Sequence, residues 1–259
     1  MSAGQNLALS VIVPAHNSGV LIEGTIDELS ERLDGSAAEI LVVENGSTDD
    51  TLARSRHQED RRRQASVGLT VLQSDKGMGR ALRAGVLASR GRRVLLTADD
   101  LPFGFDDLDH LDRLESSIDG PVPPILIGSK AHLDSTVERG ALRGTLTWGF
   151  SVLVRAILGM RTRDPQGTLI LEGNLARELA QLAVEPGYLF TTELIYLAER
   201  VGIRPVELPV RLRESHRQHR SRIHAADMVA MAIGLMRIRA RHFGSRRLGP
   251  LKAHLPSPR

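Results

Sequence analysis

Short apolar runs alternate with amphipathic segments along the first hundred residues, and this alternation constrains the fold more than any other feature. The apolar runs predict buried strands, and the segments between them have the apolar spacing of helices. The strand runs are 9–13, 39–43, 69–72 and 93–97, and the helical segments are 20–33, 51–64 and 79–89. Because strand–helix–strand units form right-handed crossovers, the sequence predicts an α/β, Rossmann-like fold with a mainly parallel sheet and helices on both faces.

The second half of the chain is less regular but contains the same kinds of element. It predicts helices at 105–117, 144–158, 173–182, 191–201 and 225–242, and strands at 125–128, 166–171 and 205–212. The length of 259 residues allows one large domain or two small ones. Since no linker separates two parts, we expect a single domain over 1–243, followed by a flexible basic tail at 244–259.

The composition excludes several classes of protein. The chain has no cysteine, which excludes disulfides, thiolate catalysis and thiolate zinc sites. Aromatic residues make up only 3% of the chain, which argues against a nucleic-acid surface that stacks bases. No basic segment precedes an early apolar run, and no apolar run reaches about 18 residues, so we expect neither a signal peptide nor a membrane-spanning helix. We therefore expect a cytoplasmic protein.

Basic residues are concentrated in two segments, 211–222 and 237–247, although the net charge of the chain is only +3. Such clusters indicate an anionic partner, and the low aromatic content favours phosphate or an anionic lipid over nucleic acid. Three histidines in and just after the first cluster, His216, His219 and His224, do not have the spacing of a zinc-binding helix, so we do not expect a zinc site there.

An apolar run that begins at Leu95 ends in two adjacent acids, Asp99 and Asp100, followed by Leu101 and Pro102. If the run is a buried strand, both carboxylates lie at the carboxyl edge of the sheet, where open α/β sheets bind ligands. Carboxylate oxygens suit a hard cation such as Mg²⁺ or Mn²⁺, which often also holds substrate phosphates. A solvated turn after a strand is the alternative interpretation.

Seven short segments occur in an order that matches a known family. They are Val11–Asn17, Leu41–Asp49, Asp75–Gly79, Ala98–Pro102, Ile127–Lys130, Arg163–Thr168 and Phe190–Leu194. Together, over residues 8–240, they resemble inverting family 2 glycosyltransferases of the GT-A fold, in the branch of the polyprenyl- and dolichyl-phosphate mannose and glucose synthases. The resemblance implies transfer of a hexose from a nucleotide-diphosphate sugar to a polyprenyl phosphate, assisted by Mg²⁺ or Mn²⁺.

The resemblance implies a donor site at the carboxyl ends of the first four strands. Asp100 takes the place of the last acid of the family's Asp-x-Asp motif and is the expected metal ligand, and Asp99 fills the middle place. Glu44 suits a hydrogen bond to a nucleoside hydroxyl, although a solvated strand end is the alternative. Glycine at position 77 lets the backbone approach a ligand closely. The expected donor-binding residues are Pro14, Ala15, Asn17, Glu44, Gly46, Gly77, Asp99 and Asp100.

Two acids are candidates for catalysis. Asp164 follows the long helix predicted at 144–158 and is expected on a loop, and Glu193 is expected in the first turn of a helix. A simple helix-dipole role is the alternative for Glu193, and an ion pair with Arg161 or Arg163 is the alternative for Asp164. A phosphate acceptor is already ionised near pH 7, so it needs a strong base less than a sugar hydroxyl does.

A phosphorylated acceptor needs cations that grip its phosphate. The expected residues are Lys130, Arg143, Arg217 and Arg220, since arginine binds phosphate through a planar fork of N–H groups. A solvated basic loop is the alternative for the last two. The helix predicted at 225–242 has an apolar face and several arginines, so it either lies on an anionic membrane at the inner face of the plasma membrane or packs on the core.

The chain departs from the family pattern at three places in the expected donor site. Ser18 stands where the family usually has an acid, Met78 where it usually has lysine, and Ala98 at the first acid of Asp-x-Asp. Two alternatives therefore remain beside the polyprenyl-phosphate transferase. One is the same fold acting on a soluble sugar or a phosphorylated small molecule, and the other is a nucleotide-binding relative without turnover.

Overall fold

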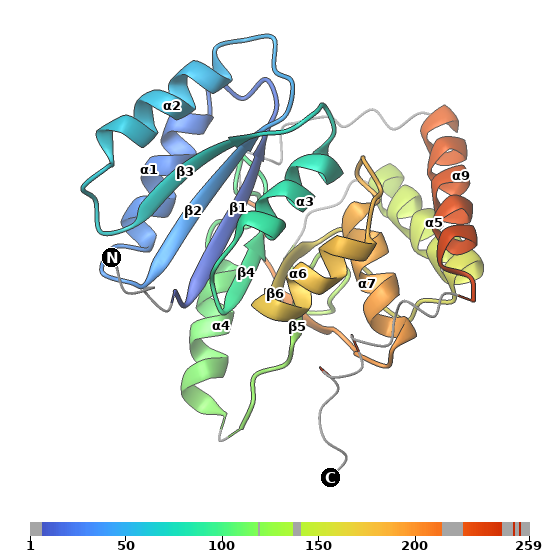
Figure 1. The fold of residues 1–259 in the computed structure, drawn as a ribbon. Helices are drawn as coiled ribbons and strands as arrows, with labels where there is room; N and C mark the ends of the chain where they lie inside the picture. Colours follow the sequence, from blue (N-terminus) through green and yellow to red (C-terminus); the bar gives the residue numbers. More distant parts are fainter. Residues whose placement is uncertain are drawn as a thin grey trace. The chain divides into compact units, whose positions relative to one another are not determined.

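A computed structural model describes residues 7–118, 120–136, 141–213, 225–244, 251 and 254, without the side chains of 141–148 and 225–228. Figure 1 shows the helices and strands of the chain, which residue contacts divide into two compact units. Unit 1 comprises Met1–Leu101 and Thr168–Phe190, and unit 2 comprises Pro102–Gly167 and Thr191–Arg259. Each unit is described by itself, and a single domain over 1–243 stays a prediction.

Unit 1 is built on strands in the order β3-β2-β1-β4-β6. Strands β1 (Leu9–Ala15), β2 (Ala38–Glu44), β3 (Gly68–Gln73) and β4 (Arg93–Leu96) are parallel, whereas β6 (Thr168–Glu172) pairs antiparallel with β4. Ala15 pairs with Glu44, and Glu44 pairs with Gln73. Because these three strands end level with one another, the loops that follow them gather at one edge of the sheet.

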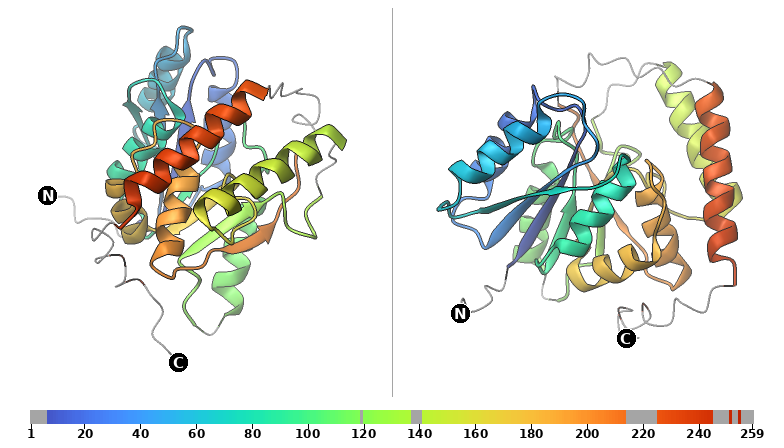
Figure 2. Two further views of the ribbon diagram at one scale, coloured as in Figure 1. Left: turned by 90° about the vertical axis from the view of Figure 1, so that its right-hand side faces the viewer. Right: turned by 45° about the horizontal axis from the view of Figure 1, so that its top comes forward.

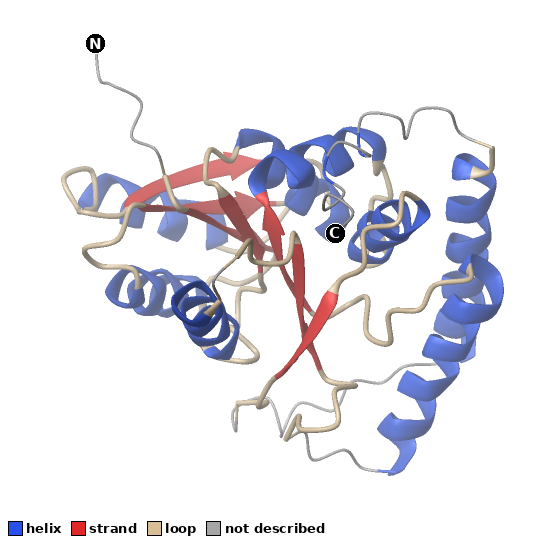
Figure 3. Ribbon diagram, turned by 90° about the horizontal axis from the view of Figure 1, so that it is seen from below, coloured by secondary structure: helices blue, strands red, loops and turns tan. Residues whose placement is uncertain are grey.

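Helices cover both faces of the unit 1 sheet, as predicted. Helices α1 (Ile22–Arg32) and α2 (Thr51–Arg61) lie on one face, and α3 (Met78–Ala88) and α6 (Gly173–Leu182) lie on the other (Figures 2 and 3). Every residue of β1 and β2 is buried, which explains why the centres of these strands, 11–13 and 40–43, are continuous apolar runs without polar alternation. This unit confirms the α/β fold with a mainly parallel sheet.

The described part of unit 2 contains the parallel strand pair β5 (Ile125–Ser129) and β7 (Val206–Pro209) with four helices. They are α4 (Asp106–Ser117), α5 (Ala141–Leu158), α7 (Phe190–Arg200) and α9 (Ala225–His242). Helices α5 and α9 lie side by side (Figures 1 and 2). None of the helices in the described part of the chain is both long and apolar enough to cross a membrane.

The predicted elements are confirmed with small shifts of their ends. The helices predicted at 173–182 and 225–242 match α6 and α9 residue for residue. The strand predicted at 205–212 is shorter, because β7 ends at Pro209 and Arg211 forms only an isolated bridge to Thr136. The antiparallel direction of β6 did not follow from the sequence, because a buried apolar run carries no information about strand direction.

Candidate donor and acceptor sites

The loops after β1 and β2 are joined through Asn17. The main-chain N–H of Asn17 donates to Ser47 Oγ at 3.1 Å, and Asn17 Oδ1 accepts the N–H of Thr48 at 2.8 Å. Asn17 has a φ of 52°, in the left-handed region that asparagine tolerates better than most residues. The predicted donor residue Asn17 therefore fixes the shape of the sheet edge, and Pro14 and Ala15 lie buried in the strand that leads to it.

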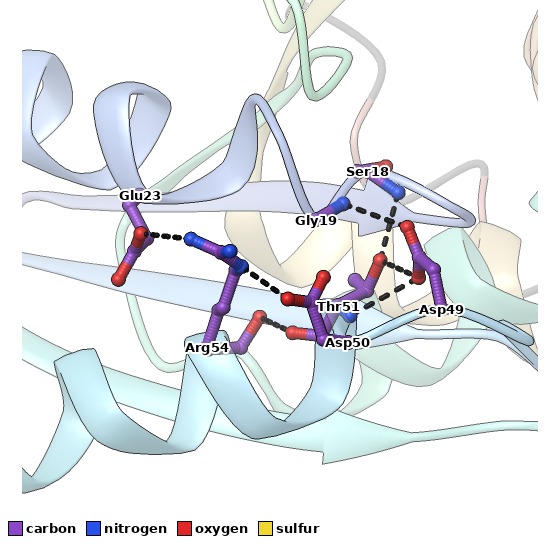
Figure 4. Close-up of polar contacts among 8 residues, drawn as sticks. Ser18, Gly19, Glu23, Asp49, Asp50, Thr51 and Arg54 are labelled. Carbon is purple, nitrogen blue, oxygen red and sulfur yellow. Dashed lines mark hydrogen bonds and ion pairs between the residues drawn. The ribbon is translucent and has the colours of Figure 1, made fainter.

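A second set of bonds ties the start of α1 to the start of α2 (Figure 4). The N–H of Ser18 donates to Thr51 Oγ1 at 2.7 Å, and the N–H of Gly19 donates to Asp49 Oδ2 at 3.0 Å. Asp49 also accepts the N–H and the hydroxyl of Thr51. These hydrogen bonds, with the Thr51 hydroxyl first among them, lower the pKa of Asp49 below its usual value. Asp49 is therefore a loop anchor at the sheet edge.

Glu44 is buried, with only 4% of its surface exposed, so it is not a solvated strand end. One carboxylate oxygen accepts the N–H of Ser47, and the other accepts Gln73 Nε2 at 3.3 Å. The next residue, Asn45, was not among the predicted residues, yet it joins the ends of β1 and β2 to the glycine-rich segment before α3. Its Nδ2 donates to the Ala15 carbonyl at 2.9 Å, and its Oδ1 accepts the N–H of Gly77 at 3.2 Å.

Both predicted glycines of the donor site have backbone conformations that disfavour a side chain. Gly46 has a φ of +75°, and Gly77 has a φ of +140°. A Cβ on Gly77 would lie 2.4 Å from the carbonyl oxygen of Pro186. That carbonyl accepts the N–H of Gly79 at 2.9 Å, so the glycine-rich segment packs directly on the backbone of the 185–187 loop. Sequence order alone did not reveal the contact between this loop and the glycine-rich segment.

The acids after β4 take different positions. The carboxylate of Asp99 accepts the hydroxyl of Ser18, and its carbonyl accepts the hydroxyl of Thr25. Asp100 precedes Leu101, whose φ of 44° is strained for a residue with a branched side chain. Two adjacent carboxylates after a strand are the hard oxygen donors that Mg²⁺ and Mn²⁺ prefer. These residues therefore fit a divalent cation whose remaining coordination positions other ligands would fill. The described residues contain no group of three or more histidine, aspartate or glutamate side chains that could hold a metal.

In unit 2, Asp164 lies on the loop between α5 and β6 and is only 6% exposed. Its Oδ2 accepts the main-chain N–H of Lys130 at 2.9 Å. The ammonium group of Lys130 lies 5.8 Å from the centre of the Phe103 ring. Neither Arg161 nor Arg163 forms an ion pair with Asp164 in the described part of unit 2, so the predicted residues Lys130 and Asp164 lie together without those arginines.

Two glutamates that the sequence analysis did not single out hold the loop that leads to Asp164. Glu199 accepts the N–H of Arg161 and the N–H of Thr162, both at 2.9 Å. Glu207 accepts the N–H of Arg163 at 2.7 Å through Oε1 and the hydroxyl of Ser129 at 2.8 Å through Oε2. Three successive main-chain N–H groups are therefore fixed by carboxylates.

Glu193 lies in the first turn of α7, as predicted, but it is completely buried. Its Oε1 accepts Arg241 Nη1 at 2.6 Å, and His242 Nε2 lies 2.7 Å from the same oxygen. Both partners come from the last turn of α9. This geometry favours a structural role that docks α9 on α7, and a catalytic role for Glu193 stays a prediction.

The remaining acceptor residues are not placed by the structure. Arg143 belongs to α5, but its side chain lies outside the description, and Arg217 and Arg220 lie in the segment 214–224, which is also outside it. Their roles as phosphate ligands stay predictions.

Comparisons with known proteins identify the family. A model of glycosyl transferase family 2 matches residues 10–113. The dolichyl-phosphate beta-glucosyltransferase of Drosophila melanogaster is 32% identical over 224 residues, which cover 81% of this chain and 68% of that protein. The Dictyostelium discoideum protein of the same name is 26% identical over 248 residues, covering 92% of this chain and 75% of that protein.

Solved structures support the fold. The glucosyl-3-phosphoglycerate synthase from Mycobacterium tuberculosis, in complex with Mn²⁺, uridine diphosphate and glucosyl-3-phosphoglycerate, is 22% identical with a TM-score of 0.60. The match covers 91% of this chain and 80% of that one. At this identity the likeness shows the fold alone. The family model, the relatives and the order of the seven segments agree, and the chain belongs to glycosyltransferase family 2.

Proposed function

We propose that this protein transfers a glucosyl group from a nucleotide-diphosphate sugar to a polyprenyl phosphate, with inversion at the anomeric carbon and with a divalent cation. The named relatives are dolichyl-phosphate beta-glucosyltransferases, which supports both the sugar and the acceptor class. The observation that carries the proposal is the edge of unit 1, where a buried Glu44 and the acids Asp99 and Asp100 follow parallel strands.

Unit 1 supplies the donor chemistry in this proposal. Glu44 and Asn17 shape the pocket for the nucleoside, and Gly77 lets the backbone approach the diphosphate. Asp100, with Asp99 beside it, would hold Mg²⁺ or Mn²⁺, which supplies positive charge against the diphosphate as it leaves. Ser18 is not an acid, but its hydroxyl holds the carboxylate of Asp99, so a carboxylate is still present beside position 18.

Unit 2 supplies the acceptor chemistry. Asp164 positions the segment that begins at Lys130 through the main-chain bond, and the ammonium group of Lys130 would bind the acceptor phosphate together with Arg143, Arg217 and Arg220. A phosphate oxygen is already ionised above about pH 6, so no residue needs to remove a proton before it attacks the anomeric carbon. The reaction therefore does not need an exposed base, which agrees with the burial of Asp164 and its hydrogen bond to the backbone.

The proposed acceptor requires contact with a membrane, and α9 presents a suitable surface. Leu235 and Ile238 of α9 are completely buried, whereas Val229, Ile233 and Met236 are 61%, 39% and 53% exposed. These exposed residues follow helical spacing and therefore share one face. With the exposed Arg237 and Arg239 of the same helix, such a face favours peripheral binding at the cytoplasmic side of an anionic membrane.

The direct test is an assay of the purified protein with Mn²⁺, labelled UDP-glucose and three separate acceptors: a polyprenyl phosphate, 3-phosphoglycerate and a free sugar. We expect a lipid-extractable β-linked product only with the polyprenyl phosphate. The Asp100→Ala variant is the matched negative control.

Product with 3-phosphoglycerate alone would replace the polyprenyl phosphate by a phosphorylated small molecule. Nucleotide binding without product from any acceptor would favour the relative without turnover. Labelled GDP- and dTDP-sugars in the same assay decide the nucleoside.

A further inference from the structure

A cavity of about 480 Å³ lies in unit 2, apart from the residues assigned to donor and acceptor. Its wall is formed by the end of α5, the loop 159–162, the second half of α7 and the segment 202–207. Three arginines line it: Arg161, Arg200 and Arg204. The proposed reaction assigns no role to any of these arginines.

Two acids, Glu199 and Glu207, also line the cavity, but their hydrogen bonds go to groups other than these arginines. Glu199 accepts hydrogen bonds from the backbone of Arg161 and Thr162, and Glu207 accepts them from Arg163 and Ser129. Both carboxylates are therefore bonded to main-chain N–H groups and hydroxyls. No carboxylate in the described part of the chain forms an ion pair with the cavity arginines.

Arg200 has partners that carry no charge. Its Nη1 donates to the main-chain carbonyl of His242 at 2.8 Å and lies 3.4 Å from the hydroxyl of Tyr196, and its guanidinium lies 5.8 Å from the centre of the Tyr196 ring. These contacts hold the side chain in place, and none of them is an ion pair with a carboxylate. Arg161 and Arg204 also line the cavity, and both residues are exposed.

We propose that this cavity binds a phosphate-type oxyanion through Arg161, Arg200 and Arg204. Arginine forks form paired, charge-assisted hydrogen bonds with phosphate oxygens, and three guanidinium groups that outnumber the two carboxylates of the cavity favour such an anion. The loop 159–162 is part of the wall and continues to Asp164, so a bound anion would also restrict the motion of that loop. The effect on Asp164 rests on the proposed function, whereas the binding site does not.

The test measures binding of inorganic phosphate by calorimetry at low ionic strength, with saturating UDP and Mn²⁺ and again without them. The probe variant is Arg161→Ala/Arg204→Ala, and the matched control is Arg56→Ala/Arg61→Ala, which removes the same charge from α2. The bonds of Arg161 to Glu199 come from its main-chain N–H, so the probe variant keeps the loop anchored.

We expect the probe variant to lose affinity for phosphate by roughly tenfold or more in both conditions, since a charge-assisted hydrogen bond contributes about a tenfold change. The control should bind as the wild type does. Sedimentation with phosphatidic acid vesicles, against phosphatidylcholine vesicles, distinguishes a lipid headgroup from free phosphate. Loss of vesicle binding in the probe variant supports the site as a headgroup site. If the probe variant binds phosphate as tightly as the control variant does, and binds each vesicle type to the same extent, the proposal is overturned.

Discussion

Replacing Glu193 separates a structural role from a catalytic one. The carboxylate is completely buried, and Arg241 and His242 contact the same oxygen at 2.6 and 2.7 Å. Removing one member of a buried ion pair typically costs about 3–5 kcal/mol of the free energy of unfolding, because the other charge stays desolvated. We therefore expect Glu193→Ala to lower stability by about that amount. The melting temperature would fall by roughly 6–20 °C, at about 2–4 °C per kcal/mol for a chain of this size.

The partner variants make the reasoning stricter. Glu193→Ala removes the carboxylate from both Arg241 and the buried His242, whereas Arg241→Ala leaves Glu193 bonded to His242. Arg241→Ala should therefore destabilise the protein less than Glu193→Ala. In a double-mutant cycle the two changes should couple by about 0.5–3 kcal/mol. Urea denaturation of the two single variants and the double variant gives these values.

The isosteric variant decides the catalytic question. Glu193→Gln keeps a side-chain oxygen for Arg241 but removes the charge, so it should lose part of the stability and keep most of the activity at temperatures where it is folded. A general base contributes about 10²–10⁴-fold to the rate. If Glu193→Gln keeps the wild-type melting temperature and loses activity by that factor, Glu193 is a base and the structural reasoning is wrong.

Three further outcomes are expected. In urea denaturation, Gly79→Ala should destabilise unit 1 by about 1–3 kcal/mol, because its Cβ would lie 2.2 Å from the Glu185 carbonyl oxygen. The control Gly24→Ala should stabilise α1 by about 0.5–1 kcal/mol, because a Cβ at this position would have no atom within 4 Å. Because the pKa of Asp49 is lowered in the folded state, its contribution to stability is present above its unfolded pKa and is lost as the pH falls through its folded pKa. Below about pH 4, the free energy of unfolding of Asp49→Asn should therefore depend less steeply on pH than that of the wild type. Asp100→Ala should abolish Mn²⁺-dependent nucleotide binding in calorimetry, and a larger loss in Asp99→Ala would reassign the metal ligand.

The local pattern of the chain determined its elements and the edge of the sheet at which the proposed donor residues lie. Apolar periodicity is set by neighbours within one turn or one strand, so α6 and α9 follow from the sequence to the residue. The carboxyl ends of parallel strands always meet at one edge, which placed Glu44 and Asp100 at that edge. The order of seven short segments was sufficient to identify the family.

The tertiary structure decided which partner each polar group has. Glu193 has the sequence of a helix-start acid, but its partner His242 lies 49 residues away on another helix. Glu207 binds Arg163, which is 44 residues away, and no local pattern marks either residue as part of that bond. Hydrogen bonds and burial depend on residues that folding brings together from distant positions. The sequence therefore determined which acids the chain carries, and only the packing of the helices and loops decided which are anchors and which remain candidates for chemistry.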